Sequence, residues 1–157
     1  MEFTPDILNV FMDKNALLTA GSGDDYNTML IGWGALGSIW SKPAATVYVR
    51  ESRYTKEFLD KQDIFTISFF DKKYKKDELI LGTKSGRDGD KIALTSLTPK
   101  KLDQGVTFEE AEVTLVCKKQ YVQKMDLAAM PEDIQKSAYA DGDMHVMYIG
   151  EVIDVIR

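Results

Sequence analysis

The sequence contains a single cysteine and a single histidine among its 157 residues. Because a disulfide joins two cysteines, Cys117 cannot belong to an internal disulfide. One thiol and one imidazole are also too few for the cysteine- and histidine-rich ligand sets of zinc sites. The sequence therefore excludes a disulfide-stabilised scaffold and predicts that the protein has no metal site.

Long hydrophobic runs and an excess of positive charge are also missing. No apolar run approaches the roughly 20 residues of a membrane-spanning helix, and residues 1–11 lack the basic region of a secretory signal. The chain has 20 basic and 25 acidic residues, which gives a net charge of −5. Such a surface repels nucleic acid, although a local basic pocket can still bind a small phosphate. We therefore expect a cytoplasmic protein with neither a membrane nor a nucleic-acid partner.

The composition that is present is that of one ordinary globular domain. Hydrophobic residues make up 44% of the chain and charged residues 29%, which excludes a disordered or fibrous protein. A chain of this length can fill one core but not two comfortably. We therefore expect residues 1–157 to form a single domain.

Hydrophobic alternation predicts six or seven short strands with short helices between them. Almost no segment can serve as a crossover helix, so the strands are expected to pair antiparallel, and closure of the sheet removes its exposed edges. The sequence thus predicts a mainly β fold: a small closed or partly open antiparallel barrel with short peripheral helices. The predicted strands are residues 15–21, 27–34, 44–50, 63–70, one or two strands in 106–125, and 143–157 with a bulge at Gly150; the predicted helices are residues 6–12 after a Thr4-Pro5 cap, 55–62, 71–82, a short helix capped by Asp90, and 131–140.

Two glycine-rich motifs in the chain point to nucleotide-binding folds that the context excludes. Residues 32–37 match G-x-G-x-x-G, and Glu51 lies near the ~20-residue offset of a ribose-binding carboxylate. A parallel return needs roughly a dozen residues, whereas six separate Gly37 from Ala44, so a hairpin is predicted instead. Residues 82–86 have the wrong spacing for a Walker A loop, and Arg87 stands where that motif needs lysine. The chain is therefore neither a Rossmann domain nor a P-loop nucleoside triphosphatase.

Guanidinium and hydroxyl groups gather just before the predicted helix 55–62. Arginine and the free N–H groups of a helix N-terminus are typical phosphate ligands. On the pattern alone, a plain helix cap with Arg53 directed to water explains the cluster equally well. A second loop around two glycines also has the capacity to bind an anion. The first cluster is Arg50, Ser52, Arg53, Tyr54 and Thr55; the second is Lys84, Ser85, Gly86, Arg87, Asp88 and Lys91.

The remaining chemical groups of interest lie on predicted strands. Strand 27–34 has one bulky face and one nearly bare face, and glycine in a strand often marks the close approach of a backbone or a flat ligand. Cys117 alternates with apolar residues and is interpreted as a core residue. A lone histidine such as His145 on a strand is more often structural than functional, and both interpretations stay open.

Five ordered blocks of this chain resemble the flavin reductase-like proteins of the FMN-binding split-barrel fold, the group that includes flavoredoxin. The blocks are NTMLIGWGALGSIWSKP, VYVRESRYTKEFL, FTISFF, SGRDGDK and HVMYIGEV. The resemblance covers nearly the whole chain. It implies a six-stranded antiparallel split barrel that forms a homodimer and holds FMN without a covalent bond near the subunit interface.

The resemblance also implies roles for individual residues. It puts Asn27, Thr28, Met29 and Trp33 beside the isoalloxazine ring. It puts the cluster from Arg50 to Thr55 around the phosphate and the loop from Ser85 to Lys91 at the cofactor, and it makes His145 a candidate contact for substrate or nicotinamide.

The implied function is an FMN-dependent oxidoreductase. FMN would accept hydride from NADH or NADPH and pass electrons to a flavin, a partner protein or a small acceptor. The alternative is a non-catalytic FMN-binding or electron-carrier dimer, because one fold can host both functions. A small barrel leaves little internal volume for a tricyclic ring, so we expect FMN on the outside, where a second subunit covers it.

Overall fold

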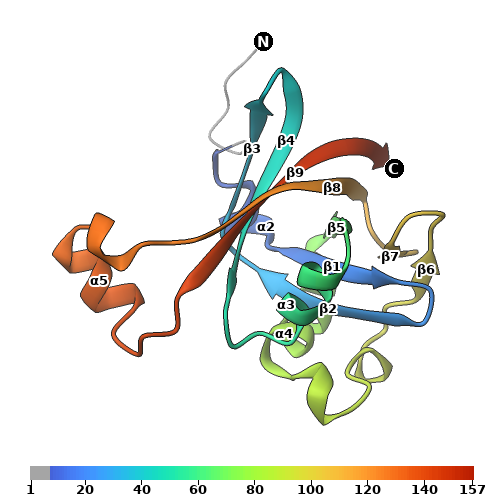
Figure 1. The fold of residues 1–157 in the computed structure, drawn as a ribbon. Coiled ribbons are helices and arrows are strands. Elements are labelled where there is room, and N and C mark those ends of the chain that lie inside the picture. The colour runs from blue at the N-terminus through green and yellow to red at the C-terminus, as the bar shows by residue number, and fades with distance from the viewer. Residues whose placement is uncertain (1–7) are drawn as a thin grey trace.

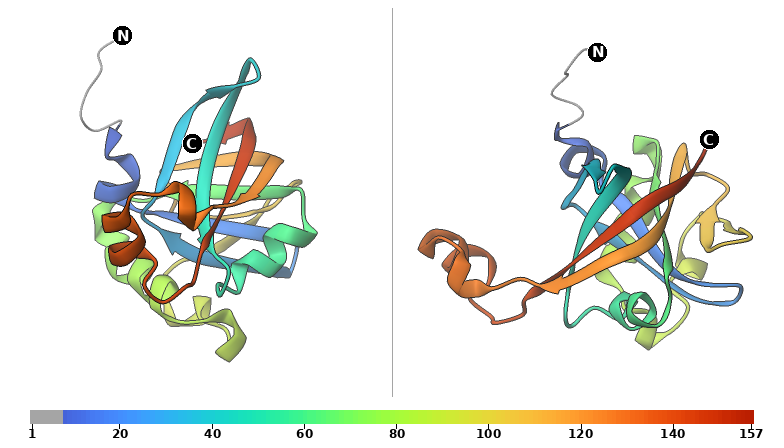
Figure 2. Two further views of the ribbon diagram at one scale, coloured as in Figure 1. Left: turned by 60° about the vertical axis from the view of Figure 1, so that its left-hand side comes forward. Right: turned by 45° about the horizontal axis from the view of Figure 1, so that its top comes forward.

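A seven-stranded antiparallel sheet forms the frame of the computed structural model, which describes residues 8–157 (Figure 1). The strands curve around a common interior in the order β2-β1-β5-β8-β9-β4-β3 (Figure 2). A separate two-stranded sheet joins β6 and β7. The strands are β1 (Ala16–Ser22), β2 (Asp25–Ile31), β3 (Gly34–Ile39), β4 (Lys42–Arg50), β5 (Ile64–Phe69), β6 (Pro99–Lys101), β7 (Val106–Phe108), β8 (Val113–Lys124) and β9 (His145–Ile156).

The helices are short and lie at the periphery of the sheet, as predicted. Figure 1 shows α5 at the far end of the long β8–β9 ribbon, away from the other strands. Asp90 accepts hydrogen bonds from the backbone of Ile92 and Ala93, so it caps a 3₁₀ turn as expected. The expected Thr4-Pro5 cap lies outside the described residues. The helices are α2 (Val10–Lys14), α3 (Thr55–Lys61), α4 (Lys75–Thr83) and α5 (Glu132–Ala138), with 3₁₀ turns η1 (Lys72–Tyr74), η2 (Gly86–Asp88), η3 (Ile92–Leu94) and η4 (Leu127–Ala129).

The mainly β fold class is confirmed, and the main sheet has seven strands, within the six or seven that alternation predicts but one more than the resemblance implies. The single strand predicted over 27–34 breaks after Ile31, and a new strand, β3, begins at Gly34. β3 forms an antiparallel hairpin with β4, and its two turn residues, Trp40 and Ser41, have φ angles of 53° and 58°. Two successive positive φ angles match the twist of antiparallel strands. The hairpin confirms that the glycine motif at 32–37 does not open a crossover helix.

The sheet remains open between its two end strands. Neither the outer edge of β2 nor that of β3 is paired within residues 8–157. The chain passes from β2 to β3 through Gly32 and Trp33, so this opening is bordered by the segment that the sequence marks as bulky on one face and bare on the other.

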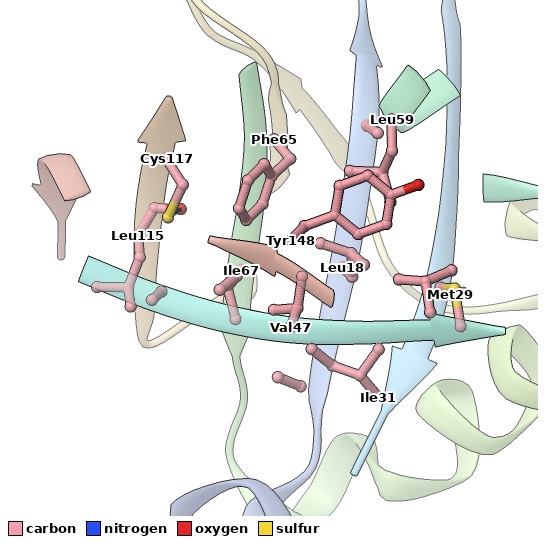
Figure 3. Close-up of a cluster of buried hydrophobic side chains, with 14 of the residues drawn as sticks. Leu18, Met29, Ile31, Val47, Leu59, Phe65, Ile67, Leu115, Cys117 and Tyr148 are labelled. Carbon is pink, nitrogen blue, oxygen red and sulfur yellow. Dashed lines mark hydrogen bonds between the residues drawn. The ribbon is translucent and has the colours of Figure 1, made fainter. Parts of the chain in front are cut away.

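The core fills the interior of the curved sheet (Figure 3). Leu18, Phe65, Ile67 and Tyr148 are fully buried there and come from β1, β5 and β9. Cys117 lies in the same cluster with no exposed surface, and burial raises the pKa of its thiol to about 12. The interpretation of Cys117 as a core residue is therefore confirmed.

β9 is continuous through Gly150, and the expected bulge lies in its pairing with β8. The register of this pairing shifts between Lys119, which pairs with Gly150, and Tyr121, which pairs with Ile149. A Cβ atom on Gly150 would lie 2.6 Å from the Phe65 ring. The glycine therefore also makes room for a core ring.

Among residues 8–157, no helix combines the length and the apolar character that crossing a membrane requires.

The close packing at Gly150 predicts a large effect of one methyl group. Gly150→Ala should lower the free energy of unfolding by about 1–3 kcal/mol, because the new Cβ overpacks the core against Phe65 and Cys117. Gly37→Ala, where a Cβ would meet no atom within 4 Å, is the matched control. Urea denaturation of both variants measures the difference, and equal midpoints would contradict the packing argument.

Candidate functional site

The two predicted anion-binding segments meet at one cavity of about 410 Å³. It lies between β2, the turn from β4 into α3, and the loop that follows α4. Lys84, which belongs to the second anion-binding loop of the sequence, also lines it, and Thr83 and Asp143, which no signal in the sequence had marked, complete the lining. Eleven of the predicted residues line it: Asn27, Met29, Arg50, Ser52, Arg53, Tyr54, Thr55, Ser85, Gly86, Arg87 and Lys91.

Positive charge dominates this cavity. Five basic residues and one acidic residue line it, although the whole chain carries a net charge of −5. The single carboxylate, Asp143, accepts hydrogen bonds from the backbone N–H and the hydroxyl of Ser52, at 3.2 and 2.6 Å. The fold therefore concentrates positive charge on one concave surface of a chain whose net charge is negative. The basic residues are Arg50, Arg53, Lys84, Arg87 and Lys91.

Two of the three arginines are held by the protein itself. The guanidinium of Arg50 donates to the carbonyls of Asp143 at 2.6 Å and Ala138 at 2.9 Å, and thereby fixes the connection from α5 to β9. The guanidinium of Arg87 donates to the carbonyl of Ser52 at 3.1 Å and forms an ion pair with Glu57 at 2.5 Å. Arg87 thus ties the second loop to the first.

Arg53 is much less constrained. It donates a single hydrogen bond, of 3.3 Å, to the carbonyl of Gly82. No carboxylate of residues 8–157 forms an ion pair with it. A guanidinium carries five N–H donors, so Arg53 can offer most of them to a ligand in the cavity.

Lys91 is the buried charge of the site. Its side chain is only 6% exposed, and its ammonium donates to the carbonyls of Leu81 at 2.9 Å and Lys84 at 3.2 Å. Burial and the neighbouring charge of Arg53 lower the pKa of Lys91 to about 8. Within the described residues, no acidic side chain pairs with this ammonium. The pair of Lys91 and Arg53 would therefore be stabilised by an anion from outside the chain.

Gly86 brings the second loop close to β2. A Cβ at this position would lie 2.2 Å from the side-chain oxygen of Asn27 and 3.1 Å from the ring of Tyr54. Asn27 in turn donates a 2.8 Å hydrogen bond to the hydroxyl of Thr55. Only a residue without a side chain fits here, so the sequence SGRD specifies the loop's position as well as its charge.

Two predicted residues line neither this cavity nor the smaller one that adjoins it. Thr28 points to the other face of β2, where its hydroxyl donates to the carbonyl of Leu18 at 3.3 Å and accepts from Thr19. Strand alternation separates it from Asn27 and Met29. Asp88 is exposed at the end of η2. Their side chains are not among those that line either this cavity or the next.

A second cavity of about 210 Å³ adjoins the first at the open side of the sheet. Trp33 and His145 meet there with ring centroids 5.0 Å apart. The two cavities share Met29, Arg50 and Arg53, so they form one continuous surface. Tyr48 was missed as a lining residue, although alternation with Arg50 along β4 could have identified it. The second cavity is lined by Met29, Leu30, Ile31, Gly32, Trp33, Tyr48, Arg50, Arg53 and His145.

His145 is buried in the second cavity's wall as a neutral imidazole. Its Nδ1 lies 2.8 Å from the hydroxyl of Tyr139. Burial and the charge of Arg50 lower the pKa of His145 to about 4, while burial raises the pKa of Tyr139. The hydroxyl of Tyr139 and Nδ1 of His145 share one hydrogen bond, whose direction follows the imidazole tautomer. His145 is thus a neutral imidazole above pH 5.

The lowered pKa of His145 predicts a pH-dependent stability. The unfolded chain binds a proton near pH 6.5 that the native chain binds only near pH 4, so this contribution is lost as the pH falls through that interval. Between pH 7 and pH 5, the free energy of unfolding of His145→Gln should therefore fall by about 1–2 kcal/mol less than that of wild type. Glu78, whose pKa burial raises to about 7, acts in the opposite direction. Both proteins contain Glu78, so the difference between their free energies of urea unfolding isolates the contribution of His145. Identical dependences of this free energy on pH would contradict a lowered pKa of His145.

The family model of the flavin reductase like domain matches residues 9–157. A comparison with curated protein sequences found no match. Among solved structures, the chain is similar to flavoredoxin from Methanosarcina acetivorans, with 20% identity and a TM-score of 0.70 over 99% of this chain and 74% of that one. It is also similar to an FMN-binding protein from Thermus thermophilus solved with p-hydroxybenzaldehyde, with 21% identity and a TM-score of 0.73 over 100% and 78% of the two chains. For flavoredoxin of Desulfovibrio vulgaris (Miyazaki F), the identity is 22% and the TM-score 0.70 over 91% and 68%. These structures share its fold, and the family match extends over nearly the whole sequence, so the chain belongs to the flavin reductase-like family.

Proposed function

We propose that the two adjoining cavities together bind FMN and that the protein is an FMN-dependent oxidoreductase. The observation that carries the proposal is the uncompensated charge of buried Lys91 beside Arg53, in a cavity of an acidic chain. A phosphate monoester carries the negative charge that this pair lacks. Membership of the flavin reductase-like family supports a flavin as the molecule that bears the phosphate.

The residues divide into a phosphate end and a ring end. At the phosphate end, Arg53 and Lys91 would bind the anion, while Arg87 and Ser52 hold the surrounding loops in place. At the ring end, Trp33 and Met29 would contact the isoalloxazine ring on one continuous surface.

When bound, FMN would supply the chemistry of accepting a hydride and releasing electrons, and the protein would orient it. Arg50 and Arg53 line both cavities, so their positive charge lies where it can stabilise negative charge on a reduced ring. His145 would offer a neutral imidazole to a substrate or nicotinamide in the second cavity. No side-chain acid or base is required for the hydride transfer itself.

We propose NADH or NADPH as the electron donor and a flavin, a partner protein or a small molecule as the acceptor. Anaerobic mixing of the FMN-loaded protein with each nucleotide should bleach the flavin absorbance near its visible maximum. FMN that is bound but stays yellow with both nucleotides would contradict a nicotinamide-driven reductase and indicate an electron carrier.

The phosphate end predicts selectivity between two flavins. Arg53→Ala should weaken FMN binding by about 1.5–3 kcal/mol, the range for a charge-assisted hydrogen bond. Riboflavin has no phosphate, so its affinity should change little. Lys76→Ala removes an exposed positive charge from α4 and is the matched control. Titration by flavin fluorescence measures both affinities for wild type and the two variants. An equal loss of affinity for both flavins in Arg53→Ala would mean that Arg53 supports the fold instead.

We further propose a cytoplasmic homodimer in which the partner covers the ring end of the site. On the β3–β4 hairpin, the exposed fractions of Leu36, Ile39 and Trp40 lie between 37% and 55%. The ring centroids of Trp40 and of Tyr121 on β8 are 6.4 Å apart. Trp33, at the mouth of the second cavity, is 50% exposed. An apolar surface of this kind is typical of an interface.

The dimer has its own test. Light scattering of the FMN-loaded protein should give twice the mass of one chain, and Trp40→Glu should shift the mass toward that of the monomer and weaken FMN binding. Ile134→Glu, an equally drastic change at an exposed position of α5, is the control. A monomer mass at full FMN occupancy would show that one chain suffices.

A further inference from the structure

One buried carboxyl group lies outside the flavin site and has no partner. Glu78, on α4, is only 2% exposed. Its Oε1 atom has no hydrogen-bond partner among residues 8–157, and no basic side chain of these residues forms an ion pair with it. A buried carboxylate without a partner is costly, whereas the neutral acid is tolerated. The packing at Glu78 therefore favours a protonated side chain.

The surroundings of Glu78 are apolar. Leu81, three residues further along α4, is fully buried in the second apolar cluster of the core. Residues three apart on a helix share one face, so buried Glu78 lies on the side of α4 that packs on this cluster. Burial raises the pKa of Glu78 to about 7, although the charge of Lys75 opposes the shift. The other buried members of the cluster are Leu17, Phe70, Leu97 and Phe108.

The described elements that pack against α4 provide no partner for Glu78. α4 lies against β2, η1 and η3 (Figure 1). Of the charges on these elements and on α4 itself, only that of exposed Lys75 acts on the pKa of Glu78. An ionised Glu78 can therefore be solvated only by leaving the interior. The titratable residues concerned are Asp25 and Tyr26 on β2, Lys72, Lys73 and Tyr74 on η1, Lys75, Lys76 and Asp77 on α4, and Lys91 before η3.

The next turn of α4 carries contacts that hold the phosphate end of the flavin site. The carbonyl of Leu81 accepts a 2.9 Å hydrogen bond from the ammonium of Lys91, and the carbonyl of Gly82 accepts one of 3.3 Å from Arg53. Gly82 packs closely on β2, since a Cβ atom on it would lie 2.9 Å from a side chain of that strand. A movement of this turn that exposes Glu78 to water would therefore also displace the acceptors of Lys91 and Arg53.

We propose that Glu78 is a proton switch for the phosphate end of the site. While its carboxyl group is neutral, the last turns of α4 stay packed on β2 and hold Lys91 and Arg53 in place. When it ionises, hydration of the carboxylate draws these turns away from the core, and the two cations lose their acceptors. The chain then binds a flavin phosphate more tightly at mildly acidic pH than at neutral pH. The effect on the ligand rests on the proposed flavin site, whereas the opening of α4 does not.

The pH window follows from the pKa of Glu78 in the packed and the open helix. The pKa of a solvated glutamate is about 4.5, and that of packed Glu78 is about 7. The packed helix thus binds the extra proton, so its advantage falls as the pH rises from 4.5 to 7 and is constant above 7. Lys91, with a pKa of about 8, adds a loss of affinity above this window. A phosphate monoester gains charge at about pH 6. These last two effects are common to wild type and a Glu78 variant.

Hydrogen exchange of the full chain without flavin tests the switch itself. The amide of Lys84 donates to the carbonyl of Ile80 at the end of α4, and the amide of Gln62 donates to that of Phe58 at the end of α3. From about pH 5 to about pH 7.5, the protection factor of the Lys84 amide should fall at least about tenfold in wild type and less than about twofold in Glu78→Gln. The protection factor of the Gln62 amide should change by less than about twofold in both.

Titration with FMN tests the consequence for the ligand. At about pH 5, Glu78→Gln should bind FMN within about twofold of wild type, because glutamine resembles the neutral acid. At about pH 7.5 it should bind FMN at least about threefold more tightly, because only the wild-type side chain ionises. Glu132→Gln, the same change at an exposed position of α5, is the matched control and should follow wild type at both pH values.

The two measurements separate the possible failures. If the protection of the Lys84 amide falls alike in wild type and Glu78→Gln, or in neither, Glu78 does not open α4 and the proposal is overturned. If α4 opens but the ratio of the two FMN affinities is the same at both pH values, the control of phosphate binding is overturned. If no protein binds FMN at either pH, the proposed function fails, and hydrogen exchange still decides whether Glu78 opens α4.

Discussion

The site depends on one electrostatic constraint, a buried lysine that has no acidic partner among residues 8–157. Removing an ammonium from water is costly unless it is hydrogen-bonded and paired. Lys91 receives two carbonyl acceptors from the end of α4, which hold it and the second loop together, but its neighbour is the like charge of Arg53. An anion in the cavity would stabilise this arrangement, so the same contacts that position the loop also suit the proposed phosphate.

The opening of the sheet places the 210 Å³ cavity next to these charges. β2 and β3 are the end strands, and the residues between them, Gly32 and Trp33, border the 210 Å³ cavity. Arg50 lines both cavities, and its two hydrogen bonds to backbone carbonyls hold the segment between α5 and β9 beside them. Segments far apart in the sequence therefore meet at one surface whose two ends differ in charge and apolar character.

Sequence reasoning identified the elements better than their exact limits. Period-two alternation located Cys117 in the core, and the short link between Gly37 and Ala44 placed β4 in a hairpin, because both follow from local spacing. It missed the break between β2 and β3, since the break depends on how Gly32 and Trp33 leave the sheet. Eleven of fifteen candidate side chains line the larger cavity, and Trp33 and His145 line the smaller one. Thr28 and Asp88 do not, because a resemblance matches positions along the chain and does not specify which face a side chain occupies. Asp143 and Tyr139 were missed because their contacts join distant segments, which no local pattern records.

The proposed binding of FMN through Lys91 and Arg53 is tested most directly by a visible spectrum. The purified protein is incubated with FMN, and unbound flavin is removed by gel filtration before the spectrum is recorded. We predict that wild type retains one FMN per chain, and that the double variant Lys91→Met, Arg53→Met loses it while its far-ultraviolet circular dichroism stays that of wild type. A wild-type protein that remains colourless, or a double variant that retains FMN at the same level, would contradict it.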